Sequence, residues 1–183
     1  MSTSDFDPFR LDVAAFAKAA GRLEGRWPQR GLDRLAESSL TDAETPSADA
    51  VAWNVRGEAR PMRGGEMQTW LHVEAATPVV LECQRCLRPV EATLKVNRSF
   101  LFVPGEDAAA QLDTDSEDDV IALTRALDLR ELIEDELLLA LPIVPKHETC
   151  PTPLRAPIDG DLVDDKPNPF AVLAALKNLE RPS

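Results

Sequence analysis

The chain has 183 residues, of which 44% are hydrophobic and 28% are charged, and its formal net charge is −12. This length and composition are typical of one globular domain and exclude an intrinsically disordered chain. The acidic balance disfavours a general nucleic-acid-binding protein, because such proteins usually carry an excess of basic residues.

The first third of the chain predicts two short helices around one strand. Asp12 can cap a helix over residues 13–20. A brief strand follows over residues 22–27, and a second helix is predicted over residues 31–40. Residues 41–49 are polar and contain a proline, which indicates a connection.

Three runs of alternating apolar and polar residues follow, over residues 51–60, 67–81 and 90–102. A period of two marks strands with one buried face. Because short connections join these strands, neighbouring ones should pair antiparallel. The sequence therefore predicts an α+β fold, in which helices pack on a twisted antiparallel sheet or on a partly open β-barrel.

The negative charge is concentrated in residues 105–141, which contain 12 acidic and 2 basic side chains. Within this stretch we expect residues 105–119 to form an acidic loop. Such a run repels itself, so a solvated loop is one interpretation. The other is a docking surface for a basic partner, such as a ribosomal protein.

A short edge strand is predicted over residues 120–123 and a helix over residues 129–141, before Pro142. Asp128 and Glu131 have the spacing of a capping box. One stripe of the helix should pack on the sheet, and its acidic residues should face water. The stripe consists of Leu129, Leu132, Ile133, Leu137 and Leu141, and the acidic residues are Glu131, Glu134 and Asp135.

We assign residues 1–147 to an α+β core domain and residues 148–183 to a proline-rich C-terminal tail. Asn168 and Pro169 are typical of a helix start, so the tail should end in a short helix over residues 170–179.

The feature with the clearest chemistry is the pair Cys83 and Cys86, at the turn between two predicted strands. Such a turn can serve as a half-site for zinc, because both thiolates can face one tetrahedral ion. His147 and Cys150 lie far downstream and could complete a Cys₃His site. Two alternatives stay open: the cysteines pack as small apolar residues, or they form a redox pair. A redox pair usually begins a helix, whereas a strand is predicted here.

Basic residues gather at the same turn and along the strand that follows it. Arginine presents planar donors that suit phosphate, so these residues are candidates for contact with RNA or with a partner. The alternative is an ordinary solvated face, compensated by Glu82 and Glu91. The candidates are Arg85, Arg88, Lys95 and Arg98.

The sequence contains no catalytic template. It has no glycine-rich phosphate loop, no Gly-x-Ser-x-Gly and no His-x-x-x-His. We therefore expect a non-enzymatic protein without a small-molecule substrate. No apolar run approaches the roughly 20 residues of a membrane span, and the first residues do not resemble a secretory signal, so a cytoplasmic location away from membranes is expected.

Three separated motifs carry a family resemblance. They are Leu-Glu-Cys-Gln-Arg-Cys at 81–86, the segment 134–147 followed by Cys150, and Lys-Pro-Asn-Pro-Phe-Ala-Val-Leu at 166–173. Together they resemble the YceD family, the large ribosomal RNA subunit accumulation proteins. The resemblance implies a cytoplasmic bacterial protein that is needed for accumulation of the large-subunit ribosomal RNA, with no established catalytic activity. Some members carry further cysteines near the C-terminus, which is consistent with zinc.

The sequence thus predicts a non-enzymatic factor for synthesis, processing or stability of large-subunit (23S) ribosomal RNA in ribosome biogenesis. Its expected partners are a ribosomal RNA precursor, or a ribosomal protein or maturation factor. An alternative is a protein-interaction module that structural zinc stabilises and that has no RNA role.

Overall fold

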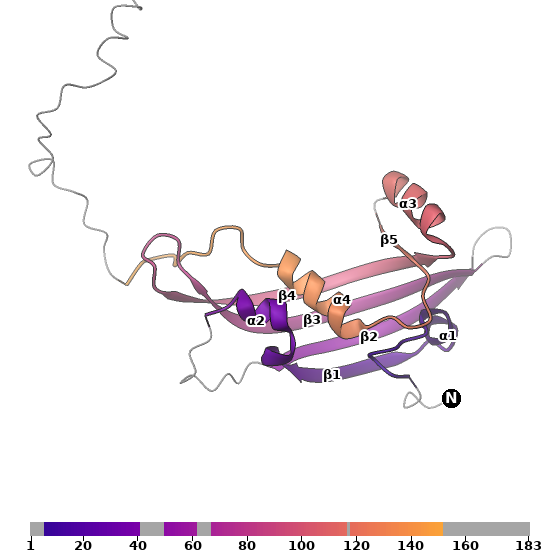
Figure 1. Cartoon of the computed structure of the whole chain (residues 1–183), viewed down its shortest axis with the longest axis horizontal. Helices are drawn as coiled ribbons and strands as arrows, with labels where there is room; N and C mark the ends of the chain where they lie inside the picture. Colours follow the sequence, from indigo (N-terminus) through magenta and orange to yellow (C-terminus); the bar gives the residue numbers. More distant parts are fainter. Residues whose placement is uncertain (1–5, 41–49, 62–66, 117, 152–183) are drawn as a thin grey trace, which may run out of the picture. The chain divides into compact units, whose positions relative to one another are not determined.

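A computed structural model describes residues 6–40, 50–61, 67–116 and 118–151 (Figure 1). The predicted terminal helix and almost all of the proline-rich tail lie outside these residues.

Five strands form one open sheet in chain order: β1 (Arg22–Pro28), β2 (Ala50–Pro61), β3 (Met67–Glu82), β4 (Pro89–Val103) and β5 (Asp119–Ala122). The first four pair antiparallel, as the short connections predict. The structure therefore has the open sheet and not the partly open β-barrel that the sequence also allowed. β5 instead lies parallel to β4. The reason is the long connection between them, which includes α3 (Glu106–Asp115) and carries the chain back before β5 begins.

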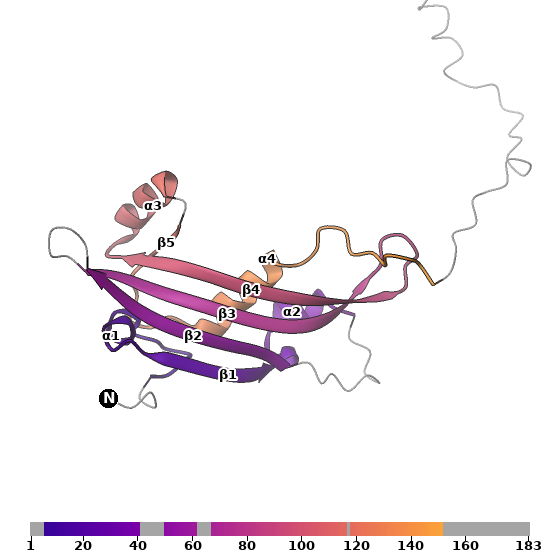
Figure 2. The ribbon, with the colours of Figure 1, turned by 180° about the vertical axis from the view of Figure 1, so that it is seen from behind.

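The core lies on one face of the sheet. α1 (Val13–Lys18), α2 (Asp33–Glu37) and α4 (Leu129–Leu139) cover this face in Figure 1, and Figure 2 shows the same sheet from behind with the strands in front. The alternating residues predicted to face inward on β2 and β3 are buried, among them Val55 and Val73. Gly57 allows α1 to touch the sheet, because a Cβ there would lie 2.8 Å from the Cα of Ala17.

The predicted helix caps at Asp12 and Asp128 are confirmed, and the predicted helix start at Asn168 lies outside the described residues. The Asp12 carboxylate accepts from the Ala15 amide at 3.0 Å, and Asp128 accepts from the Arg130 amide at 2.8 Å. The second predicted helix is shorter than expected, because a 3₁₀ turn (Gln29–Gly31) precedes α2.

The predicted acidic loop is mostly wrong, because residues 106–115 form the helix α3. The stretch contains Ala108, Ala109, Ala110 and Leu112, which are strong helix formers. Two of its acidic residues, Glu106 and Asp107, fall in the first turn, where negative charge is favourable. Helix propensity thus outweighs the repulsion between the acidic side chains.

The prediction that all the acidic residues of α4 face water is also wrong. Glu134 is buried, and one of its carboxylate oxygens accepts from the backbone amides of Arg34 at 2.8 Å and Leu35 at 3.1 Å. These amides belong to the first turn of α2, which no side chain of its own N-terminus caps. The other carboxylate oxygen of Glu134 binds the Arg34 guanidinium at 3.0 Å. One buried carboxylate therefore caps a neighbouring helix and neutralises its arginine.

No helix among the described residues is long and apolar enough to span a membrane.

Replacement of Glu134 with alanine should destabilise the fold. Glu134→Ala leaves two amides at the start of α2 without an acceptor, so we expect a loss of about 2–4 kcal/mol in the free energy of unfolding. Asp135→Ala is the matched control, because Asp135 pairs with the same arginine at the surface. It should cost under about 1 kcal/mol. Urea denaturation followed by circular dichroism measures both, and equal losses would contradict the capping role.

Candidate metal centre

The turn that joins β3 to β4 places two thiols on one side. Residues 83–88, which we call the tip, close through two backbone bonds: the Cys83 amide donates to the Arg88 carbonyl at 2.9 Å, and the Leu87 amide to the Cys83 carbonyl at 2.8 Å. Leu87 adopts the left-handed conformation that this closure requires, with φ of 58°. As predicted, a strand and not a helix follows Cys86.

A second segment lies against the tip. Residues 140–151, which we call the return segment, leave α4 and run alongside the hairpin (Figure 1). The Gln84 amide donates to the Pro145 carbonyl at 2.9 Å. The Arg85 guanidinium donates to the His147 carbonyl at 2.6 Å and to the Glu148 carbonyl at 3.3 Å. Hydrogen bonds of the backbone and of Arg85 therefore hold the two segments together without a metal ion.

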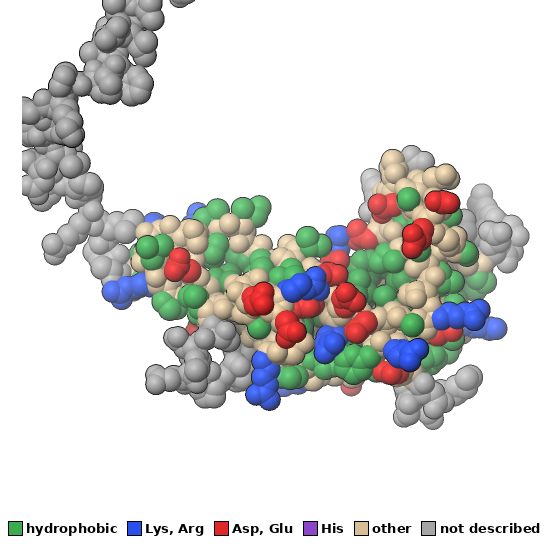
Figure 3. Space-filling model, viewed as in Figure 1, with side chains coloured by type: hydrophobic (Ala, Val, Ile, Leu, Met, Phe, Trp, Pro, Cys, Tyr) green, Lys and Arg blue, Asp and Glu red, His purple; other side chains and the backbone are tan. Residues whose placement is uncertain are grey.

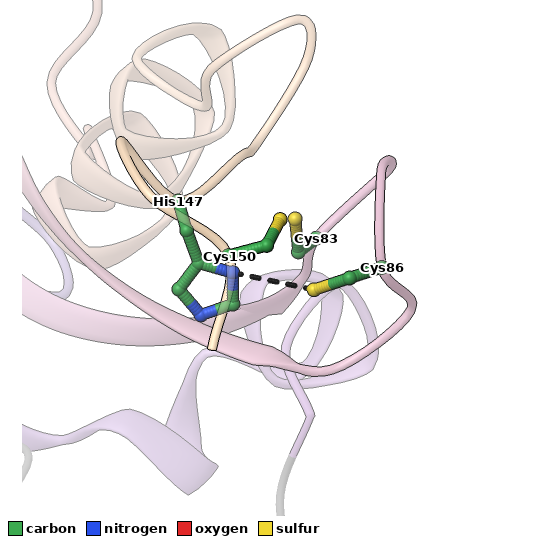
Figure 4. A group of neighbouring side chains, drawn as sticks. All are labelled: Cys83, Cys86, His147 and Cys150. Atoms are coloured by element: carbon green, nitrogen blue, oxygen red, sulfur yellow. Dashed lines mark hydrogen bonds between the residues drawn. The ribbon is translucent and has the colours of Figure 1, made fainter. Parts of the chain in front are cut away.

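The contacts bring the four predicted ligands into one cluster. The three sulfurs of Cys83, Cys86 and Cys150 and a ring nitrogen of His147 all lie within 4.8 Å of one another. In Figure 4 the side chains of the tip and of the return segment point toward one another. The distance from the Cys86 sulfur to His147 Nδ1 is 3.5 Å. Neighbouring ligand atoms around a tetrahedral zinc lie about 3.5–3.8 Å apart. The distance between the Cys86 sulfur and His147 Nδ1 already falls in this range.

The imidazole of His147 is held in the tautomer that a metal needs. Its Nε2 lies 3.0 Å from the Pro89 carbonyl oxygen, which can only accept a hydrogen bond. Nε2 is therefore the donor in this contact, and Nδ1 is the ring nitrogen that faces the Cys86 sulfur. A backbone carbonyl in this role is typical of histidine ligands, since it orients the ring and raises its basicity.

The surroundings of the cluster act in opposite directions on the thiols of Cys83 and Cys86. Burial by itself raises the pKa of Cys83, but backbone hydrogen bonds from His147, Arg85 and Cys86 outweigh it and lower that pKa to about 5. For Cys86, burial together with the neighbouring Cys150 and Cys83 sulfurs raises the pKa. The thiols of Cys83 and Cys86 thus compete to ionise, and a divalent cation bound to both would remove that competition.

Arg85 completes the cluster from outside. Its Nε donates to the Cys150 sulfur at 3.0 Å. A cationic donor stabilises a thiolate and offsets part of the negative charge of three such ligands. The donor set of sulfur and nitrogen suits Zn²⁺, whereas Mg²⁺ and Ca²⁺ prefer oxygen. The cluster could therefore hold a structural metal such as zinc.

The four basic candidates do not form one surface. Arg85 is used within the cluster, and Arg88 is exposed beside it. Lys95 lies on the bare face of the sheet, where it helps to line a groove of about 770 Å³. Arg98 lies on the opposite face, where it pairs with Asp119 at 2.8 Å and Glu136 at 3.4 Å. Among these residues, only Arg88 is available for contact at the tip.

The sequence indicates the four residues of the cluster but not the groups that support them. Cys-x-x-Cys spacing and the His-x-x-Cys pair indicate ligands directly. The Pro89 carbonyl has no side-chain signature, and the part that Arg85 plays depends on the fold that places Cys150 beside it.

Comparison with known proteins identifies relatives. Residues 71–177 match the family model described as "Large ribosomal RNA subunit accumulation protein YceD". The chain is 34% identical over 177 residues to the Large ribosomal RNA subunit accumulation protein YceD of Haemophilus influenzae, which covers 91% of this chain and 95% of that protein. No solved structure matches.

Purified protein should contain one zinc ion per chain by elemental analysis. His147→Asn should lower the zinc content because it removes a ligand, and Cys83→Ser should do the same. His72→Asn is the matched control, since His72 is the other histidine of the chain and lies outside the cluster. A metal-free protein with the wild-type fold would contradict the assignment.

Arg85 should raise zinc affinity without being a ligand. Arg85→Ala removes the donor to Cys150, and loss of a side chain that hydrogen-bonds to a metal ligand typically weakens metal binding about 10–100-fold. Competition with a chromophoric chelator measures the affinity. Arg88→Ala should change the affinity less than twofold, so equal effects of the two variants would argue against support of Cys150 by Arg85.

Proposed function

We propose how this chain, which belongs to the YceD family of large ribosomal RNA subunit accumulation proteins, carries out its role in ribosome biogenesis. It acts as a binding factor that supports synthesis, processing or stability of the large-subunit ribosomal RNA, and it does so without catalysis. Its partners are ribosomal RNA or ribosome-related proteins. Family membership over most of the chain is the observation that carries this proposal.

One polar chain on the sheet could be mistaken for a catalytic triad. Ser99 Oγ lies 2.8 Å from His72 Nδ1, and His72 Nε2 lies 2.8 Å from Glu58. The hydrogen bond from Arg60, followed by that from His72, lowers the pKa of Glu58 to about 2. His72 and Ser99 are register neighbours on adjacent strands. We therefore interpret this chain of bonds as cross-strand pairing, which supports the non-catalytic assignment.

We assign the contact with the ribosomal precursor to the tip and the return segment. This end of the hairpin combines the metal cluster with the exposed cation of Arg88, in a chain whose net charge is strongly negative. A structural zinc would hold both segments in one geometry, so that the contact surface exists before the partner arrives.

The acidic helix α3 is a second candidate surface. Its first turn carries Glu106 and Asp107, and its side chains are exposed apart from Ala109 and those not described. We propose that it faces a basic ribosomal protein or maturation factor, since a negative surface repels RNA and attracts cationic partners.

Cells that lack the gene should show less large-subunit RNA relative to small-subunit RNA. Northern analysis of precursor and mature RNA measures this ratio. Arg88→Glu should restore the ratio poorly, and Cys83→Ser should behave similarly because it releases the tip. Lys95→Glu is the matched charge reversal on the bare face of the sheet and should restore it fully.

The outcomes separate the candidates. A normal ratio in cells without the gene would reject the RNA role and leave the zinc-stabilised interaction module. Failure of Lys95→Glu with success of Arg88→Glu would move the contact to the open face.

A further inference from the structure

We infer that the tip and the return segment dock on a protein partner that presents an apolar groove bordered by carboxylates. The inference names the partner class for the contact end assigned above and so rests on the proposed function. The observation behind it is a group of large apolar side chains that are exposed and not packed in the core.

The most exposed large apolar side chains of the described residues lie at this end. Ile143 is 99% exposed, Leu139 is 77% exposed and Leu87 is 69% exposed. Val144 of the return segment is also exposed. Figure 3 shows hydrophobic side chains gathered over the segment that leads from α4 to the hairpin end. Apolar groups gathered on a surface are typical of a protein interaction site.

Leu87 shows that stability alone does not account for these residues. Its backbone has φ of 58°, where glycine or asparagine is favoured and a leucine is strained. Its side chain recovers little of this cost by burial, since most of it is exposed. A residue that is unfavourable for its backbone and unburied in the chain itself indicates a contact made outside the chain.

The cations beside the apolar group define the partner's charge. Arg88 follows Leu87, and Lys146 lies two residues after Val144. Both are exposed, and neither has an ion-pair partner among the described residues. Carboxylates at the border of an apolar groove would complement them.

The composition of this end favours protein over RNA. Residues 82–89 and 139–150 contain no Phe, Tyr or Trp, and their one imidazole, that of His147, is engaged with Cys86 and the Pro89 carbonyl. Unpaired bases are usually bound by stacking on aromatic rings, whereas aliphatic side chains bury well in an apolar protein groove.

Site-specific photo-crosslinking in growing cells tests the inference. The full chain carries p-benzoylphenylalanine at Ile143, and the control carries it at Met67, which is 58% exposed on the strand end remote from the tip. We expect a discrete protein adduct from position 143 only, mapped by mass spectrometry to an apolar segment that contains Asp or Glu. Leu87→Gly and Arg88→Glu should each lower its yield at least tenfold.

Leu87→Gly also separates docking from folding. Because glycine suits φ of 58°, the variant should keep its zinc and show an unchanged or raised melting temperature while it loses the adduct. A lower melting temperature or lost zinc would make Leu87 structural and overturn the inference.

Other results of the crosslinking experiment would also overturn the docking inference. The adduct could form with RNA, with a second copy or with residues 152–183 of the same chain. Alternatively, Leu87→Gly could leave the adduct yield unchanged, or position 143 could give no adduct beyond that of the Met67 control. If loss of the gene lowers large-subunit RNA and Leu87→Gly restores it fully, the proposed function stands and only the docking inference fails. If loss of the gene leaves the RNA unchanged, the proposed function fails independently of the adduct.

Discussion

The geometry of the tip depends on how the far end of the β3–β4 hairpin is held. The β2–β3 pairing stops at Ala52 and Ala76, whereas the β3–β4 pairing continues to Glu82 and Pro89. Beyond Ala76 the ladder therefore consists of two strands, and an isolated two-stranded ribbon is marginal in water. Near the sheet this ribbon is supported by the buried side chains of Val79 and Leu81 and by the Leu40 amide, which donates to the Val80 carbonyl at 2.7 Å. At its far end the support comes from the bonds of Gln84 and Arg85 to the return segment and from the Cys₃His cluster. The same contact orders Leu87 and Ile143, so stability and recognition rely on one junction.

Charge is separated along β4. The tip precedes the first residue of this strand and α3 follows its last residue, so the cationic and acidic ends lie about 45–50 Å apart along the strand. The Debye length at physiological salt is about 8 Å, so each end acts on its partner without screening the other. One molecule can thus present two surfaces of different chemistry to a large assembly.

Strands, helix caps and the residues of the Cys₃His cluster could be predicted because each has a local signature. Alternation of apolar and polar residues along β2 and β3 indicates the buried face of each strand. Asp12 and Asp128 are typical N-cap residues, and Cys83 and Cys86 have the spacing of a metal-binding pair. The parallel pairing of β5 could not be predicted in this way, since alternation reveals a face and not a neighbour. The burial of Glu134 has no local signature, because the amides that it caps lie about a hundred residues away in the chain. In α3 two local signals oppose each other, since acidic composition favours a loop and the alanines between the charges favour a helix.

The positions of the cluster residues in the sequence also set the order in which they are synthesised. Cys86 and His147, whose side chains meet in the cluster, are 61 residues apart in sequence. Translation at about 5–20 residues per second delivers the imidazole about 3–12 s after the thiols. A nascent polypeptide stalled within α4 contains Cys83 and Cys86 but lacks His147 and Cys150, and two ligands retain a metal far more weakly than four. The complete four-residue cluster therefore exists only in chains that the ribosome has extended past Cys150.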